Sequence, residues 1–306
     1  MQPRDTIGAG TRYCAVYGHP VRHSASPAMH NAGMRALGLD WRYLAFDLPP
    51  GDLKPALAGA AAMRFIGVNL TVPHKLMAVE LMDELDESAR TWGAVNTVRF
   101  EARDESGAWK PVAEVATREG QKVRAHGFNT DADALARAIE EELGLPLEGA
   151  KVMLAGAGGA GRAAALRLAA AKAECVWLVN RTASKAAAVQ AEIEQRFPGA
   201  RTVTGYPDTN VDLIINATSL GLKSGDPLPW DMEKYPLRRT AKVYDMVYRP
   251  AESGLIRAAR REGCKAVNGL GMLLYQGAKA LEIWSGRTAP VKVMRRALED
   301  FIRSVE

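Results

Sequence analysis

Residues 151–162 read KVMLAGAGGAGR, and this stretch decides the fold of the chain. Its first five residues, 151–155, are short and apolar enough for a buried strand of a parallel sheet. Gly156, Gly158 and Gly161 follow in the spacing G-x-G-x-x-G. In that pattern the first glycine permits a tight turn, the second admits a pyrophosphate close to the backbone, and the third lets a helix pack against the strand.

The flanks of the glycine-rich turn complete a βαβ unit. A helix is expected over residues 163–172 and a second strand over 175–179. Because phosphate binds the free amides at a helix N-terminus, we expect Gly158, Gly159 and Ala160 to contact the pyrophosphate. A plain strand-to-helix loop is the alternative, but the order of elements favours a nucleotide-binding unit.

The segment after the second strand indicates which dinucleotide is bound. An NAD site carries Asp or Glu there to hold the ribose 2′-hydroxyl. Residues 180–185 contain no carboxylate and instead offer a guanidinium, an ammonium and hydroxyls to a 2′-phosphate. We therefore expect NADP, with NAD as a weaker alternative, at Asn180, Arg181, Thr182 and Lys185. Thr182 is also the expected N-cap of the next helix, which is compatible with phosphate contact.

Composition excludes several classes of protein. The net charge of +5 favours small anionic ligands and is too small for nucleic acid. No apolar run approaches the ~20 residues that span a bilayer. The first ten residues lack the apolar core of a signal peptide, so a cytoplasmic protein is expected. Cys14, Cys175 and Cys264 are too scattered for a disulfide framework. His19 and His23 flank a proline and lack a third ligand, so no metal is expected.

The 306 residues exceed a single core and predict an α/β fold of two domains. We expect an N-terminal α/β substrate domain over residues 1–130 and a Rossmann-type domain over 131–268, with C-terminal helices in 269–306 returning to the first domain. The insert at 101–126 is expected to be a hairpin or long loop, with an oligomer contact or a lid as alternatives. The other expected strands are 13–17, 41–48, 65–70, 95–100, 211–216 and 242–248, and the other helices are 27–37, 52–63, 130–143, 270–284 and 290–305.

Polar residues cluster where strands end or helices begin, which is where α/β proteins bind ligands. Together, in this order and over nearly the whole chain, these clusters resemble the motifs of the shikimate dehydrogenase family. They are Ser24-Ala25-Ser26-Pro27, Asn69-Leu70-Thr71-Val72-Pro73-His74-Lys75, Ala94-Val95-Asn96-Thr97, Asn129-Thr130-Asp131, Asn216-Ala217-Thr218-Ser219, Tyr244-Asp245-Met246-Val247-Tyr248 and Gly269-Leu270-Gly271-Met272 with Gln276.

The resemblance implies an NADP-linked oxidoreductase of the chorismate pathway and aromatic amino acid biosynthesis. Such an enzyme interconverts shikimate, a small anionic carbocycle, and 3-dehydroshikimate by hydride transfer. Lys75 and Asp131 are the implied catalytic pair. Removal of hydride from a carbinol requires loss of the hydroxyl proton, and the reverse reaction requires a proton donor. Taken alone, Lys75 would be read as a solvated surface group and Asp131 as a helix-start residue.

The same resemblance assigns the remaining ligand contacts. Ser24 and Ser26 would bind the substrate carboxylate with Tyr248 nearby, and Thr71, Asn96 and Gln276 would bind ring hydroxyls, since amides both donate and accept. Thr218, Met246 and Gly269 would lie near the adenosine ribose or the nicotinamide. Ser26 is also an expected N-cap before Pro27, whereas Ser24 has no such structural role.

Two other functions stay open at this point. One is a dehydrogenase of the same family that acts on quinate or aminoshikimate, a choice that depends on the groups around Ser24 and Tyr248. The other is a catalytically silent NADP-binding regulator, which would not need both Lys75 and Asp131. The assembly, either a monomer or a homodimer, is also open.

Overall fold

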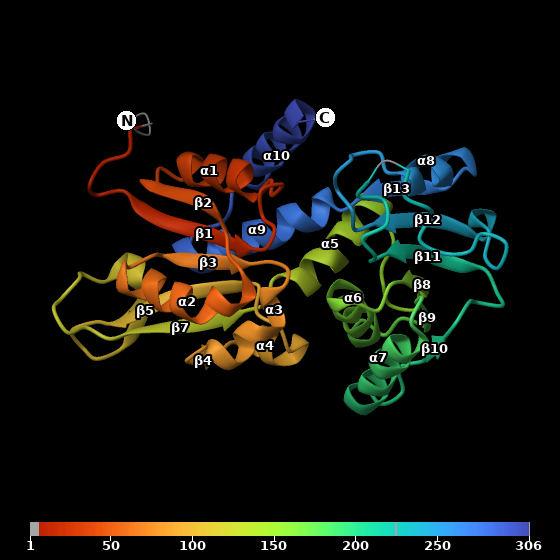
Figure 1. Ribbon diagram of the computed structural model, residues 1–306, viewed down its shortest axis with the longest axis horizontal. Helices are drawn as coiled ribbons and strands as arrows, with labels where there is room; N and C mark the ends of the chain where they lie inside the picture. Colours follow the sequence, from red (N-terminus) through yellow and green to blue (C-terminus); the bar gives the residue numbers. More distant parts are fainter. Residues whose placement is uncertain (1–5, 224, 306) are drawn as a thin grey trace. The chain divides into compact units, whose positions relative to one another are not determined.

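The computed structural model describes residues 6–223 and 225–305, which form two compact units (Figure 1). Unit 1 contains the chain up to Thr130 together with Leu274–Val305, and unit 2 contains Asp131–Leu273. The second boundary falls inside helix α9 (Leu270–Ser285) rather than near Asn268. The reason is that the first turn of α9 belongs to unit 2, where the Met272 N–H donates to the Tyr244 hydroxyl at 3.3 Å.

Unit 1 is built on a mixed sheet in the order β2-β1-β3-β5-β7-β4, with β6 paired to β5. Strands β1, β2 and β3 are parallel, whereas β5 is antiparallel to both β3 and β7. The strands are β1 Arg12–Gly18, β2 Trp41–Asp47, β3 Gly67–Leu70, β4 Glu84–Leu85, β5 Thr97–Arg103, β6 Trp109–Pro111 and β7 Val123–Phe128. The helices are α1 Ser26–Ala36, α2 Leu53–Ala62, α3 His74–Met77, α4 Glu87–Trp92, the later turns of α9, and α10 Val291–Val305.

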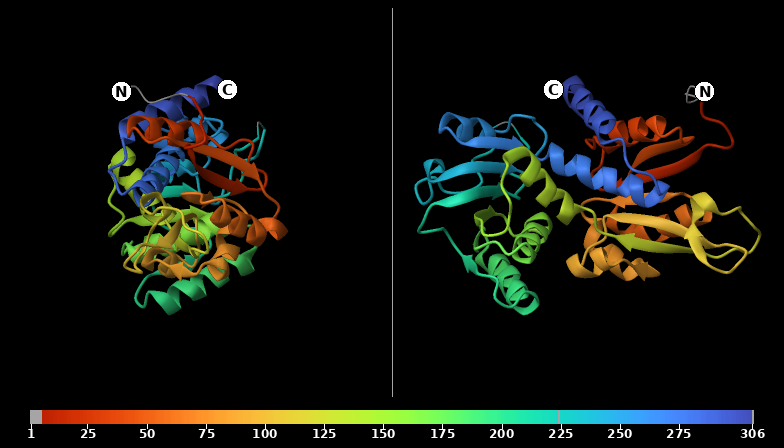
Figure 2. Two further views of the ribbon diagram at one scale, coloured as in Figure 1. Left: turned by 90° about the vertical axis from the view of Figure 1, so that its left-hand side faces the viewer. Right: turned by 180° about the vertical axis from the view of Figure 1, so that it is seen from behind.

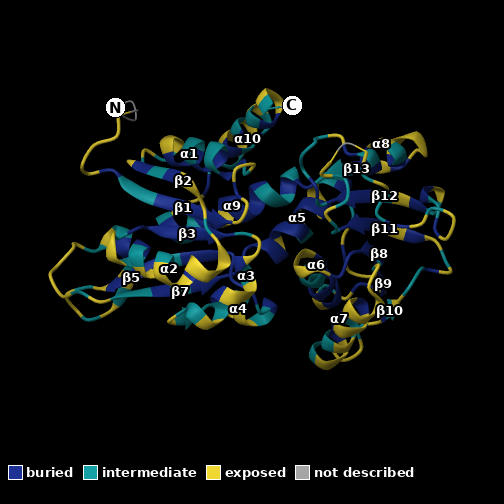
Figure 3. Ribbon diagram, viewed as in Figure 1, coloured by how far each residue is buried: buried dark blue, intermediate teal, exposed yellow. Residues whose placement is uncertain are grey.

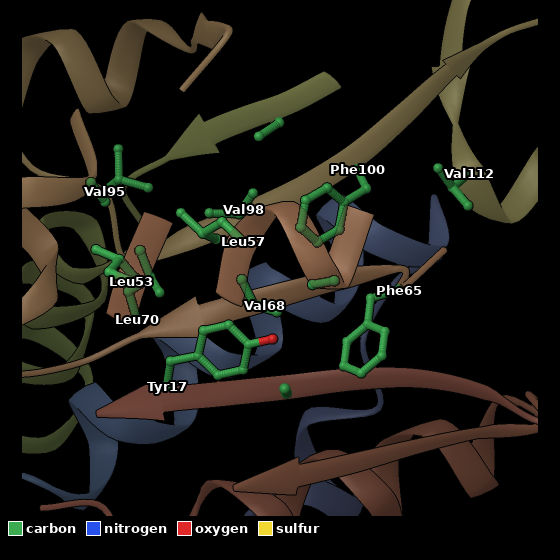
Figure 4. Packing of buried hydrophobic residues seen from close by; sticks show 14 of the residues in the cluster. Tyr17, Leu53, Leu57, Phe65, Val68, Leu70, Val95, Val98, Phe100 and Val112 are labelled. Atoms are coloured by element: carbon green, nitrogen blue, oxygen red, sulfur yellow. The ribbon is translucent and has the colours of Figure 1, made fainter. Parts of the chain in front are cut away.

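Helices cover both faces of this sheet. Helix α2 places Leu53 and Leu57 over Val68, Val98 and Phe100 in one apolar cluster (Figure 4). Helix α9 crosses the opposite face (Figure 2), where the Trp284 indole N–H donates to the Val98 carbonyl at 3.0 Å. The central strands are accordingly buried on both sides (Figure 3). Burying each large apolar side chain contributes roughly 1.5–3 kcal/mol to folding.

Unit 2 is a parallel sheet in the order β10-β9-β8-β11-β12-β13. Counted from its first strand, this is the order 3-2-1-4-5-6 of Rossmann folds, with the switch point between β8 and β11. The strands are β8 Lys151–Ala155, β9 Cys175–Val179, β10 Thr202–Thr204, β11 Val211–Asn216, β12 Thr240–Asp245 and β13 Lys265–Asn268. The helices are α5 Asp131–Leu143, α6 Gly159–Ala170, α7 Ala183–Arg196 and α8 Gly254–Arg261. The predicted α/β fold class is therefore confirmed.

Several element boundaries differ from the sequence expectation. Strand β12 ends at Asp245 instead of residue 248, because the Val247 N–H turns back to the Asp245 carboxylate at 3.1 Å. Strand β5 begins at Thr97 instead of residue 95, because the Val95 N–H donates to the Lys75 carbonyl at 2.8 Å. The short strands β10 and β13 were not expected, since they carry few apolar residues, and the helix α8 was not expected although Leu255, Ile256 and Ala259 form a buried apolar face.

The insert at 101–126 forms a hairpin, as expected, that is fastened to the body of unit 1. Trp109 pairs with Arg103 across β5 and β6, and the Arg12 guanidinium donates to the Val112 carbonyl at 2.8 Å. Strand β5 spans seven residues, or about 20 Å, from its start beside Asn96 to the hairpin. This placement at the far end of β5 does not support a lid over Asn96.

Cys14, Cys175 and Cys264 are buried and free. Burial raises the pKa of the Cys175 and Cys264 thiols, so these side chains pack as neutral apolar groups. Within residues 6–223 and 225–305, no helix has both the length and the apolar content needed to cross a membrane.

A buried carboxylate ties the antiparallel part of the unit 1 sheet together. Glu101 is only 2% exposed, and it accepts hydrogen bonds from Arg124 Nε at 2.7 Å, from His126 Nδ1 at 3.1 Å and from Arg99. Burial alone raises its pKa, but the hydrogen bonds from His126, Arg99 and Arg124 outweigh burial and lower the pKa to about 2. The ionised carboxylate is therefore part of the stable fold.

We expect Glu101→Gln to lower the free energy of unfolding by about 3 kcal/mol at neutral pH, because two guanidiniums lose a buried partner. The wild type should lose this contribution as pH falls from the ordinary Glu pKa of 4.5 toward about 2, and the variant should lack that pH dependence. Urea unfolding between those pH values measures both effects. The control is Glu105→Gln, which removes an 84% exposed carboxylate paired with Arg118 and should change little. Equal losses in the two variants would contradict the role of Glu101.

Candidate active site

Polar residues of three neighbouring strands meet at one edge of the unit 1 sheet. Asn69 lies opposite Thr97 in the β3–β5 register, and Thr97 lies opposite Phe128 in the β5–β7 register. Because β5 runs antiparallel, its first residues share this edge with the last residues of β3 and β7. The structure thus brings together the residues that follow Asn69, the residue Asn96 before β5, and the Asn129-Thr130 pair after β7.

Asn96 is the most constrained side chain of this edge. It is 1% exposed, and its Oδ1 accepts the backbone N–H of Thr130 at 2.8 Å. Its Nδ2 donates to Thr130 Oγ1 at 2.9 Å. The backbone N–H of Asn96 donates to the Phe128 carbonyl at 3.1 Å. The end of β7 and the start of β5 are therefore fixed relative to each other at this point.

Lys75 is held at the same edge through its backbone. It lies half-buried on the short helix α3, and its carbonyl accepts the N–H of Val95, the neighbour of Asn96. The preceding residue, His74, contacts the Leu48 carbonyl through Nε2 at 2.9 Å. A carbonyl only accepts, so Nε2 carries the proton, and burial lowers the pKa of His74, which keeps the ring neutral. Asp131 is 8% exposed and begins α5 in unit 2, directly after Thr130 in the chain.

The serine motif differs from the sequence expectation in one respect. Ser26 is the first residue of α1 and Ala25 occupies the N-cap position, so the predicted Ser26 cap is wrong. Ser24 instead has the structural role it was expected to lack, because its Oγ accepts the N–H of Ser26 at 3.3 Å. Pro27 lies in the first turn of α1, where its missing N–H is not needed, and the Ser24 hydroxyl accepts the free N–H of Ser26.

The other expected substrate residues lie on separate elements. Thr71 follows β3, and its methyl group packs so closely on Gly18 that a Cβ there would lie 2.3 Å from it. Gln276 is buried on α9 in unit 1, at 9% exposure. Tyr248 is half-buried in unit 2, three residues after β12 ends.

In unit 2 the glycines of the first turn divide into two kinds. Gly161 is required by the fold, since a Cβ there would lie 2.0 Å from the Gly156 carbonyl oxygen. Gly156 has a φ of +109°, which favours glycine. Gly158 and Gly159 are different, because a Cβ at either position would meet nothing within 4 Å in the described residues. The fold leaves open the space in front of these two glycines at the N-terminus of α6, as a bound pyrophosphate requires.

The loop after β9 contains one residue that holds the glycine turn in place and two exposed cations. Asn180 braces the glycine turn, since its Oδ1 accepts the Ala157 N–H at 3.0 Å and its Nδ2 donates to the Thr182 carbonyl at 2.8 Å. Thr182 occupies the N-cap position of α7, but its hydroxyl makes no capping hydrogen bond. Arg181 and Lys185 are exposed, and their side chains form no ion pair within residues 6–223 and 225–305. These residues fit a 2′-phosphate.

Asn216, which sequence reasoning named within a motif but gave no role of its own, lies beside Thr218 and Met246, two of the cofactor candidates of unit 2. The side-chain Oδ1 of Asn216 accepts a hydrogen bond from Thr218 Oγ1 at 2.8 Å, and its backbone carbonyl accepts one from the Met246 N–H. Its Nδ2 donates to Asp245 Oδ1 at 2.8 Å. Burial raises the pKa of Asp245, against the hydrogen bonds from Ser253, Val247 and Asn216. Gly269 completes the group, since a Cβ there would lie 2.3 Å from the Met246 carbonyl oxygen.

Family models match three parts of the chain. The shikimate dehydrogenase substrate binding domain matches residues 16–98, the shikimate / quinate 5-dehydrogenase domain matches 135–221, and the shikimate 5'-dehydrogenase C-terminal domain matches 269–299. A shikimate dehydrogenase (NADP(+)) of Moorella thermoacetica is 40% identical over 304 residues, which cover 96% of this chain and 95% of that protein. The chain belongs to the shikimate dehydrogenase family.

Solved structures of this family and its neighbours have the same fold. A shikimate 5-dehydrogenase from Thermus thermophilus in complex with NADP(H) and shikimate is 37% identical, with a TM-score of 0.76 and coverage of 95% of this chain and 99% of that one. The ligand-free 5-ketofructose reductase of a Gluconobacter species is 32% identical, with a TM-score of 0.78 and coverage of 96% and 100%. The shikimate dehydrogenase fold is therefore shared with a protein named for a different substrate.

We expect Gly158→Ala to raise the KM for NADP about tenfold or more while the free energy of unfolding changes by about 0.5 kcal/mol or less, since the new methyl group projects into open space that a pyrophosphate would need. Gly161→Ala should instead lower the stability, because its methyl group collides with the Gly156 carbonyl. Thermal unfolding and NADP titration of both variants test this division. A Gly158→Ala variant with unchanged NADP affinity would contradict it.

Proposed function

We propose that this protein is an NADP-dependent oxidoreductase that interconverts shikimate and 3-dehydroshikimate in the chorismate pathway. The observation that supports it most is the anchoring of two chain segments on the dipeptide Val95-Asn96. The Val95 N–H donates to the Lys75 carbonyl, and Asn96 Oδ1 accepts the Thr130 N–H. The backbones of Lys75 and Thr130 are thus tied to adjacent residues, and Asp131 is the next residue after Thr130. The Lys75 carbonyl and the residue directly before Asp131 are therefore anchored on the same dipeptide.

In this proposal Lys75 and Asp131 handle the proton of the reacting oxygen. When bound, NADP accepts or supplies the hydride at the ring carbon. The Lys75 amine takes the hydroxyl proton during oxidation and returns it during reduction, and the Asp131 carboxylate accepts a hydrogen bond from the ammonium form. Asp131 begins α5, where the helix dipole stabilises the charged carboxylate.

The remaining residues orient the two ligands. We assign the substrate carboxylate to Ser24, Ser26 and Tyr248 and the ring hydroxyls to Thr71, Asn96 and Gln276. We assign the pyrophosphate to Gly158, Gly159 and Ala160 above the turn of Gly156, and the 2′-phosphate to Arg181, Thr182 and Lys185, with Asn180 bracing the loop. We place Thr218, Met246 and Gly269 near the adenosine ribose or the nicotinamide. The fit of NADP is supported by the open space at Gly158 and Gly159 and by the unpaired cations after β9.

The setting of the enzyme is also proposed. We expect a cytoplasmic protein that acts on a small anionic carbocycle, as a monomer or a homodimer, without nucleic acid or membrane. Size-exclusion chromatography with light scattering decides the assembly, and removal of the exposed tip of the β5–β6 hairpin tests whether that hairpin joins two copies.

The test of the proposed function is a panel of substrates compared by kcat/KM. The purified protein should reduce NADP with shikimate faster than with quinate or aminoshikimate, and should reduce 3-dehydroshikimate in preference to 5-ketofructose. NAD should replace NADP with a kcat/KM lower by about tenfold or more, because it leaves the cations after β9 without a phosphate. Inactivity toward the whole panel would favour a regulatory NADP-binding protein instead.

Lys75→Met tests the role of the amine, since the substitution keeps a long side chain and removes the amine. We expect kcat for shikimate oxidation to fall about a hundredfold or more, the usual contribution of a proton carrier. Binding of NADP, measured by fluorescence, should stay unchanged. Turnover near that of the wild type would remove Lys75 from the proposed mechanism.

Arg181→Ala should raise the KM for NADP about tenfold or more and leave the KM for NAD nearly unchanged, because only NADP carries the 2′-phosphate. The control is Arg238→Ala, which removes another exposed guanidinium from unit 2, at the opposite end of β12 from Asp245. Steady-state kinetics with both dinucleotides measure the difference. Equal increases in both KM values would argue against a phosphate contact at Arg181.

A further inference from the structure

A buried tyrosine lies behind the substrate edge of unit 1. Tyr43, in the middle of β2, is fully buried, and its hydroxyl donates to Asn69 Oδ1 at 2.8 Å. Its ring stacks on His30, with centroids 4.2 Å apart and planes 5° from parallel. The Trp284 ring lies 6.1 Å away on α9. The aromatic packing holds the Tyr43 ring in place, and the Ser26 side chain also hydrogen-bonds the Tyr43 hydroxyl.

The partners of Asn69 fix the orientation of its amide. Asn69 Nδ2 lies 3.1 Å from the Asn96 carbonyl oxygen and 2.9 Å from Thr97 Oγ1. A backbone carbonyl only accepts, so the Asn69 nitrogen must face it and the Asn69 oxygen must face Tyr43. Both hydrogens of the amide are then used within the protein. The Thr97 hydroxyl, having accepted one of them, has its own hydrogen to donate.

The same reasoning fixes the amide of Asn96. The Thr130 backbone N–H only donates, so Asn96 Oδ1 must face it, at 2.8 Å. The hydroxyls of Thr97 and Thr130 also lie 3.3 Å from this oxygen. The oxygen is therefore saturated by the protein. Asn96 Nδ2 donates one hydrogen to Thr130 Oγ1, and within the described residues its second hydrogen has no protein acceptor.

We propose that Tyr43 is a positioning residue that, through Asn69 and Thr97, holds Asn96 as a hydrogen-bond donor toward the substrate. This inference rests on the proposed function, and it corrects the expectation that Asn96 both donates and accepts. The group that Asn96 contacts is then an oxygen with a free lone pair, either a hydroxyl or a ketone. A protonated amine in place of that substrate oxygen would put its N–H donors against the Asn96 N–H donor, which disfavours an aminated ring at that position.

The test is Tyr43→Phe, which removes the hydroxyl and keeps the aromatic stack. We expect the KM for shikimate, and the Kd for shikimate measured by calorimetry, to rise about tenfold, because the buried Asn69 Oδ1 loses its hydrogen-bond donor and the Asn69–Thr97–Asn96 network is held less firmly. The KM for NADP and kcat should each change by about twofold or less, within the range of a surface substitution. A purely structural role would lower stability without separating the two KM values.

The matched control is Tyr17→Phe, the same chemical change in the neighbouring strand β1. The Tyr17 ring lies in the apolar cluster beneath α2 (Figure 4), so loss of the Tyr17 hydroxyl should leave the shikimate KM unchanged. Should Tyr43→Phe fail to fold, Thr97→Val and Thr97→Ser form a second pair, of which only the first loses the hydroxyl and should raise the shikimate KM. Unchanged shikimate affinity in Tyr43→Phe or Thr97→Val, or an equal rise in Tyr17→Phe, overturns the inference. A wild type without shikimate activity overturns the proposed function instead.

Discussion

The hydrogen bond from the Thr130 backbone N–H to Asn96 Oδ1, 2.8 Å long, is the constraint on which the substrate side of the molecule depends. It joins the exit of β7 to the entry of β5 at the edge of the sheet. It also holds the backbone of Thr130, the residue directly before Asp131, with which α5 begins. Because a backbone N–H can only donate, the same bond also orients the Asn96 amide.

The two units present different kinds of polar group to a ligand. In unit 1, side chains such as Asn69, Asn96 and Thr97 hydrogen-bond one another and leave few polar atoms for a ligand. In unit 2, the ligand groups are mainly backbone amides at the start of α6, and side chains such as Asn180 and Asn216 hold the loops around them. A small polyol acid is recognised by oriented side chains, whereas a pyrophosphate is recognised by amides and a helix dipole.

Local patterns predicted much of this arrangement. The limits of β8, β9 and β11 coincide with the apolar runs, because a buried parallel strand is apolar along its whole length. The two edge strands of the unit 2 sheet, β10 and β13, were harder to predict, since they are short and mix polar with apolar residues. The prediction that Ser26 caps α1 was wrong because Ser24 and Ser26 are the same residue type. Only the folded turn shows that the Ser24 hydroxyl accepts the free N–H of Ser26.

The sequence by itself determined the Rossmann topology, the preference for NADP and the set of polar residues at strand ends, because these follow from glycine spacing, apolar periodicity and charge within short segments. Only the tertiary structure decided which of those polar atoms are already used. Tyr43 carries no motif, yet it contacts Asn69 from a strand 26 residues away. Hydrogen-bond saturation depends on partners that are remote in sequence, so no local pattern can report it.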